Sequence, residues 1–161
     1  MILFKIRRIT SSFTRPSDTT AYASGDLVAN STTAGSVTPL KFNIGTGGFR
    51  LHGIRIGKSG TTITNATFTL HLFESIPTVA NGDNGAISTT RSSKVGSVDL
   101  PIMVAYTDAA QAHIRLGDTG FLTPLAGYTT TGLVYGLLEA KAAYTPASAE
   151  VFDVILVLEQ A

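Results

Sequence analysis

The sequence contains no cysteine and no tryptophan, and only 14% of its 161 residues are charged. The absence of cysteine excludes a disulfide framework, a thiolate metal site and a cysteine nucleophile. The charged fraction is low beside the roughly 25% of an ordinary soluble domain. Because interface cores are depleted in charge, this deficit favours a surface partly covered by neighbours. A domain kept soluble by its many Thr and Ser hydroxyls is the alternative.

Long apolar runs and a strong net charge are also missing. No stretch approaches the ~20 apolar residues of a membrane span, and three cations interrupt the apolar run from Met1 to Ile9. This run therefore does not read as a signal peptide. The formal net charge of +1 gives no strong attraction to nucleic acid or to an anionic membrane. We expect a protein that stays in the cytosol where it is made, without a membrane or direct nucleic-acid partner.

Alternation of apolar and polar residues with period two dominates the chain, which predicts β-strands. The pattern is clearest in residues 67–72, 98–105 and 151–159. The last run is apolar on both faces in its middle, because Ile155 and Val157 stand opposite the main apolar face. Such a pattern is typical of a central strand covered on both sides. Packing of the second face on a partner subunit is the alternative.

The alternation changes phase once, around Gly53. Phe49 and Leu51 share one face of the predicted strand, whereas Ile54 and Ile56 share the other phase. One extra residue in a strand produces this exchange, and glycine is common where a strand bulges or bends. The sequence therefore predicts a bulge or bend at Gly53.

Turn-forming stretches separate about eight predicted strands after residue 35, and the single helical expectation is one turn at Asp108–Ala112. This predicts an all-β fold, an antiparallel β-sandwich or barrel whose order is either immunoglobulin-like or a jelly roll. Residues 1–35 are rich in Ser, Thr and Ala and read as an extended N-terminal arm with an edge strand, leading into a domain at 36–161. An ordinary pair of edge strands with a long loop is the alternative for this segment.

A phosphate-binding loop is suggested by Gly57-Lys58-Ser59 but fails on spacing. The pattern needs a glycine five positions before the Gly-Lys pair, and Gly53 is one residue too close. The residues that follow, 61–64, favour a strand, so no helix N-terminus would hold the phosphate. We predict a hairpin turn here.

Metal and catalytic sites are not indicated either. His52, His71 and His113 lack the paired spacing of a β-barrel metal site and read as surface or interface residues. Asp83 and Asn84 lie in a Gly-flanked loop without the alternating ligands of a calcium loop, so we predict a tight turn. No G-x-S-x-G elbow is present. We expect no catalytic, metal or cofactor-binding residues and no enzyme; a glycosidase built on two scattered carboxylates is the alternative.

Several segments together resemble a known family. Residues 13–26, Lys58-Ser59-Gly60, residues 64–73, Pro77 and Gly82-Asp83-Asn84 are similar to small virion proteins of tailed bacteriophages, the capsid cement or decoration proteins. The resemblance implies a jelly-roll fold, self-association into dimers or trimers, and contact with the major capsid protein. It also implies a place on the outside of the phage head in the virion, assembled in the bacterial host cytoplasm.

The function implied is to bind the outer surface of the head and to stabilise the capsid by bridging major capsid protein subunits. Edge pairing of residues 3–9 with another chain is one mode of contact, with the cations facing an acidic capsid patch. An edge strand kept soluble by its charges is the alternative. The candidate capsid or subunit contacts are Leu3, Phe4, Lys5, Ile6, Arg7, Arg8, Phe13 and Arg15.

A receptor- or glycan-binding β-module of a phage tail fibre or spike is the alternative function. Glycan sites present aromatic faces beside clustered polar groups. The chain has no tryptophan and five tyrosines. Tyr106, Tyr128 and Tyr144 lie near predicted turns and would form the aromatic platform of such a site.

Overall fold

The computed structural model describes residues 5–101, 103–117 and 125–160, and within these ranges the chain forms strands and no α-helix. The strands are β1 (Lys5–Thr14), β2 (Leu27–Val28), β3 (Leu40–Asn43), β4 (Gly47–Lys58), β5 (Phe68–Phe73), β6 (Lys94–Leu100), β7 (Val104–Ala105), β8 (Ala110–Arg115), β9 (Leu125–Thr129), β10 (Leu133–Ala140) and β11 (Val151–Gln160), with one 3₁₀ turn, η1 (Ala34–Ser36). The all-β prediction is confirmed. The helical turn predicted at Asp108–Ala112 is wrong, because residues from Ala110 onward pair with β4 as β8.

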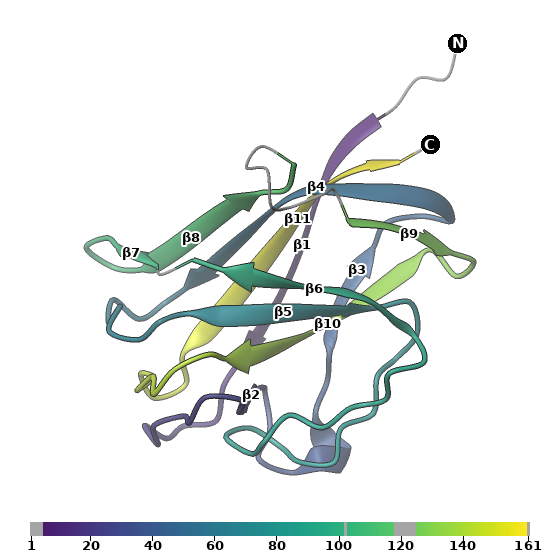
Figure 1. The fold of residues 1–161 in the computed structure, drawn as a ribbon. Helices are drawn as coiled ribbons and strands as arrows, with labels where there is room; N and C mark the ends of the chain where they lie inside the picture. The colour runs from purple at the N-terminus through teal and green to yellow at the C-terminus, as the bar shows by residue number, and fades with distance from the viewer. Residues whose placement is uncertain (1–4, 102, 118–124, 161) are drawn as a thin grey trace.

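The strands form two antiparallel sheets that face each other (Figure 1). One sheet has the order β1-β11-β4-β8-β7, with β9 also on β4; the other has the order β2-β10-β5-β6, with β3 also on β10. Setting β2, β7 and β9 aside, the first strand pairs with the last, the second with the seventh, the third with the sixth and the fourth with the fifth. This is a long hairpin rolled into two sheets, which is the jelly roll and not the immunoglobulin order.

The core lies between the two sheets and is built by alternate residues of each strand. On β11, Phe152, Val154, Leu156 and Leu158 point inward, and each is at most 1% exposed. The ring of Phe68 on β5 meets that of Phe152 edge to face, with centroids 5.4 Å apart. One apolar face per strand therefore joins the sheets, as the alternation predicted.

The bulge predicted at Gly53 is confirmed. Val157 stands opposite Gly53, whereas the next residue, Leu158, stands opposite Leu51, so His52 is the extra residue on β4. Leu51 and Ile54 can therefore both point into the core, although three positions separate them. The extra residue turns outward, where its Nε2 lies 2.8 Å from an Oε atom of Glu159.

The N-terminal segment is built into both sheets. Residues 5–14 form β1, which pairs with β11 from Lys5 opposite Gln160 to Thr14 opposite Val151. Residues 27–28 form β2 and pair with β10. The described part of the segment 1–35 thus includes an edge strand of the sandwich, and the domain boundary at residue 35 stays a prediction.

Candidate interaction surface

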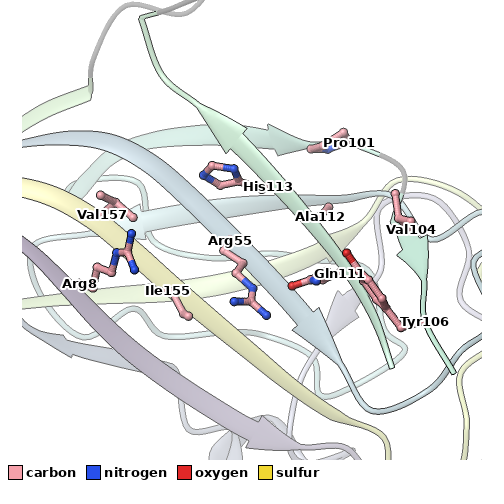
Figure 2. Close-up of a pocket in the computed structure, with 10 residues that line it drawn as sticks. All are labelled: Arg8, Arg55, Pro101, Val104, Tyr106, Gln111, Ala112, His113, Ile155 and Val157. Atoms are coloured by element: carbon pink, nitrogen blue, oxygen red, sulfur yellow. The ribbon is translucent and has the colours of Figure 1, made fainter. Parts of the chain in front are cut away.

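The outer face of the sheet that contains β1, β11, β4 and β8 is hollowed. The main hollow has a volume of about 490 Å³ and is open to solvent (Figure 2). A second hollow shares Arg8, His113 and Val157 with it, and a third shares Arg55, Tyr106 and Gln111. The three hollows form one continuous surface, called the outer face below. The residues that line the main hollow are Arg8, Arg55, Pro101, Val104, Tyr106, Gln111, Ala112, His113, Ile155 and Val157.

Strand register brings the polar and apolar groups of the outer face together. Ile155 stands opposite Arg55, and Arg55 stands opposite His113, so one row crosses three strands. In the next row Arg8 stands opposite Val157. Both apolar side chains of β11 remain partly exposed, because no second layer covers this face within the described residues. The prediction of a strand covered on both sides is therefore wrong for the chain alone, and packing against a partner stays open.

The outer face combines unpaired cations with exposed apolar groups. Within the described ranges, neither Arg8 nor Arg55 has an ion-pair partner. Val104 is 60% exposed and Tyr106 52% exposed beside them, while Asp153 lines only the third hollow. Arginine and aromatic residues over an apolar floor are the composition of a protein interface. The surface suits a partner that brings carboxylates around an apolar centre.

The predicted contact residues at the start of the chain are partly within the described structure. Leu3 and Phe4 lie outside the described residues. Lys5, Ile6 and Arg8 are exposed on β1, and Ile6 has 71% of its surface open to solvent. Arg8 belongs to the outer face, so one predicted contact residue joins the main hollow.

Two other predicted contact residues point to the inner side of β1. Arg7 is half-buried and donates hydrogen bonds to the Ile44 carbonyl and to Gln160 Oε1. Phe13 is half-buried and stacks on Phe152, with ring centroids 5.6 Å apart. Both side chains therefore help to hold β1 on the sandwich, and each keeps only part of its surface for a partner.

Arg15 is not a surface contact, and its selection is wrong. Arg15 is 2% exposed, and its Nη2 lies 2.8 Å from Asp83 Oδ2. Tyr22 accepts a hydrogen bond from Arg15 and donates one of 2.6 Å to Asp83, whose Oδ1 also accepts from the backbone N–H of Ala29. Burial, together with the charge of Asp83, raises the pKa of Tyr22. A buried cation is tolerated here because its carboxylate partner is within contact and fully hydrogen-bonded.

The hydrogen bonds of Asp83 distinguish a calcium-binding loop from a tight turn at residues 82–85. Both carboxylate oxygens of Asp83 already accept from protein donors and point into the core, so they are not calcium ligands. Asn84 has a φ of 61°, and the Gly85 N–H donates to the Gly82 carbonyl. The predicted tight turn is confirmed.

Lys58 takes part in a second buried ion pair of the same kind. Its Nζ lies 3.0 Å from Glu150 Oε1 and donates to the Gly60 carbonyl at 2.8 Å. The Tyr144 hydroxyl donates to Glu150 Oε2 at 2.6 Å, and the Tyr144 ring stacks on Tyr22 at 6.3 Å. The hairpin turn predicted at residues 57–59 is wrong, because β4 and β5 belong to different sheets. Lys58 faces a carboxylate, so its charge is already paired within the protein.

The predicted aromatic platform loses one member. Tyr144 is fully buried between the sheets, where burial and the bonded carboxylate raise the pKa of its phenol. Tyr106 and Tyr128 are exposed, at 52% and 62%. Of the two, Tyr106 lines the main hollow of the outer face.

His71 belongs to a polar chain that the sequence did not indicate. Its Nδ1 lies 2.7 Å from Ser97 Oγ and its Nε2 lies 2.6 Å from Glu139 Oε2, across three neighbouring strands. Burial lowers the pKa of His71, so the neutral ring donates through Nε2 and accepts from the Ser97 hydroxyl. Ser97 lies within a strand and lacks the strand-to-helix turn that forms an oxyanion hole. The geometry supports a buried hydrogen-bonded cluster, and the prediction of a surface position is wrong for His71, which is 9% exposed.

Two further searches concern only the described residues. Within them, no group of three or more His, Asp or Glu side chains is placed to hold a metal ion. In the same ranges, no helix has the length and apolarity to cross a membrane.

Comparison with known proteins gives only distant similarities. No protein-family model matches the chain, and no curated protein matches its sequence. A chain of the cyanophage Pam1 capsid asymmetric unit is 14% identical with a TM-score of 0.35, over 98% of this chain and 85% of that one. Chains of deformed wing virus carrying the GFP gene and of Triatoma virus are each 10% identical with TM-scores of 0.27, over 99% and 98% of this chain and 78% and 66% of theirs. These TM-scores are too low to support a fold assignment, which depends here on the strand order.

Proposed function

We propose that this chain is a structural, non-catalytic virion protein that binds the outer surface of a phage head as a dimer or trimer. It stabilises the capsid by bridging major capsid protein subunits. The observation that carries the proposal is the outer face, where Arg8 and Arg55, which have no ion-pair partner among the described residues, share a hollow with exposed Tyr106 and Val104. The resemblance of several sequence segments to phage cement proteins supports the same role.

The chemistry of the outer face defines the partner surface. Two guanidinium groups favour carboxylates placed to accept paired hydrogen bonds, and the apolar floor at Ile155 and Val157 favours an aliphatic or aromatic side chain between them. Charge complementarity speeds and orients the encounter, whereas apolar burial contributes most of the affinity. A protein that binds only the assembled shell stabilises that shell by mass action.

Charge reversal on the outer face tests the proposal. Arg55→Glu is expected to weaken binding to purified expanded heads at least tenfold, because it places a carboxylate against the partner's carboxylates. Co-sedimentation of the labelled protein with heads gives the affinity. Lys94→Glu is the matched control, since Lys94 is an exposed cation on β6 of the opposite sheet and should keep wild-type binding.

Substitution is preferable to deletion in this test. Removing residues 1–12 would strip most of β1 from β11 and expose the core. Arg55 is exposed on a central strand, so its replacement leaves the sandwich intact. Equal affinities for wild type, Arg55→Glu and Tyr106→Ala would contradict the proposal.

A receptor- or glycan-binding module of a tail fibre or spike is the second candidate. The placement of Tyr106 beside Gln111 in the main hollow favours it, since aromatic faces and amides are common in sugar sites. A glycan array probed with the wild-type protein separates the two roles. Binding to an array sugar that Tyr106→Ala abolishes, without affinity for heads, would favour the second candidate over the first.

A further inference from the structure

The side of β1 away from β11 is a free sheet edge. Within the described residues β1 pairs only with β11, in continuous register over ten residues without a bulge. The backbone N–H of Arg15 donates to the Glu150 carbonyl at 3.0 Å, and the backbone of Val151 bonds to Ser59 on the other side of β11. Hydrogen-bonded and non-bonded pairs alternate in an antiparallel ladder. The odd residues of β1 therefore bond to β11, and the N–H and C=O groups of even residues point to the free edge.

The side chains at this edge are incompletely covered as well. Ile9 and Phe13 point inward and pack on the core, yet both stay half-buried because no strand lies beyond β1. Natural sheets usually protect a long edge with charged side chains, proline, a bulge or an overlying segment, and the charges of β1 are confined to its first half. β1 has neither proline nor bulge, and β3 contacts it only across the corner of the sandwich, where the Lys41 N–H donates to Ser11 Oγ. The edge can accept another strand.

We propose that a second copy of this chain occupies the edge, with the two β1 strands antiparallel about a two-fold axis that passes beside Ser11. Ser11 then faces Ser11 of the second copy. Ile9 faces Phe13 of the second copy, and Arg8 faces Thr14. Because the axis is two-fold, the contact between Ile9 and Phe13 forms twice. In each contact the two half-buried apolar side chains cover one another.

The charge pattern of β1 favours this self-pairing. Its three cations all lie in the first half of the strand, and its hydroxyl residues lie in the second half. With the axis beside Ser11, residues 8–14 of the two copies pair and Arg8 faces Thr14. Lys5 and Arg7 extend beyond the paired segment, so no two cations of β1 face each other. An axis beside Thr10 would instead place Ile9 opposite Ser11 and leave Phe13 opposite Arg7. Only the axis at Ser11 gives both Ile9 and Phe13 an apolar partner.

The pairing rests on the oligomer of the proposed function and specifies the interface that forms it. A two-fold axis perpendicular to the sheet leaves the outer faces of both copies on the same side of one continuous sheet. Arg8 lies on β1, so the two main hollows flank the junction. Two sites held in fixed geometry would bind a repetitive surface more tightly than either alone.

Single cysteines test the register, because the native chain has none. Ser11→Cys is expected to give a covalent dimer under mild oxidation, since it faces itself across the axis in a non-hydrogen-bonded pair, where the Cβ atoms are closest. Thr10→Cys and Ser12→Cys face each other's positions and not themselves, and should stay largely uncrosslinked. Preferential crosslinking at Thr10 or Ser12 would overturn the proposed axis.

A proline on the free edge tests the pairing without disturbing β11. The Thr10 N–H points to the second copy, so Thr10→Pro removes an intermolecular donor and no bond to β11. Light scattering should give twice the chain mass for wild type and Thr10→Ala, and at least tenfold weaker dimerisation for Thr10→Pro with cooperative unfolding retained. A monomeric or trimeric wild-type chain would overturn the pairing. A trimer that still binds heads through Arg55 would overturn the pairing and leave the proposed function standing.

Discussion

Lys58→Met is expected to lower the free energy of unfolding by about 3–5 kcal/mol, the range for removing one partner of a buried ion pair. The Lys58 and Glu150 side chains are 0% and 1% exposed, so water cannot replace the lost ammonium. Methionine keeps most of the volume, but the carboxylate is left buried with the Tyr144 hydroxyl as a donor and without a cation. Chemical denaturation followed by circular dichroism measures the change.

The double variant Lys58→Met with Glu150→Gln separates charge from packing. A neutral amide can still accept the Tyr144 hydrogen bond, and no buried charge remains, so the double variant should recover part of the lost stability. Exposed Lys94→Met is the matched control and should change stability by less than about 0.5 kcal/mol. A loss under about 1 kcal/mol in Lys58→Met would show that the carboxylate finds other solvation.

Stability is expected to fall steeply as the pH rises above about 10, the ordinary pKa of tyrosine. Burial raises the pKa values of Tyr22 and Tyr144 in the folded state. In the unfolded chain both phenols lose their protons near pH 10, whereas in the folded chain they keep them. Unfolding therefore releases protons, and stability present below pH 10 is lost as the pH rises, by roughly 1 kcal/mol per pH unit for each tyrosine.

Urea denaturation at a series of pH values between 8 and about 11.5 measures this slope. Tyr22→Phe should reduce the slope by about half, because one of the two protons is no longer released. Tyr128→Phe is the matched control, since Tyr128 is 62% exposed, and it should leave the slope unchanged. A wild-type stability that does not change over this range would contradict the interpretation.

The fold was predictable where one face of a strand is buried. The alternation in residues 151–159 and the phase change at Gly53 both follow from the division between core and solvent, and both predict the local structure correctly. The segment Asp108–Ala112 was misjudged, because alanine and glutamine favour a helix locally, whereas pairing of β8 with β4 decides the conformation. Strand order could not be derived, since pairing of β1 with β11 joins residues that are far apart in the sequence, from Thr14 with Val151 to Lys5 with Gln160.

The candidate surface was predictable only in part. Arg8 was found because a cationic edge strand is a local pattern, but Arg55, His113 and Ile155 come from three strands and meet only through register. Arg15 was misplaced because its partner, Asp83, is 68 residues away and no spacing announces the pair. A buried ion pair can be recognised only when both of its residues, and the burial of each, are known.

The pairing of Lys5 with Gln160 places the two ends of the described chain side by side at one end of the ladder between β1 and β11. Tension applied between those two residues would peel the strands apart one hydrogen-bonded pair at a time. Tension applied along the strands from opposite ends would instead load all the pairs in parallel as shear. The molecule should therefore resist little force when it is pulled by Lys5 and Gln160, and much more force when it is pulled along its strands. Attachment to a stretching surface through the outer face and the edge of β1 would load it in the stronger direction.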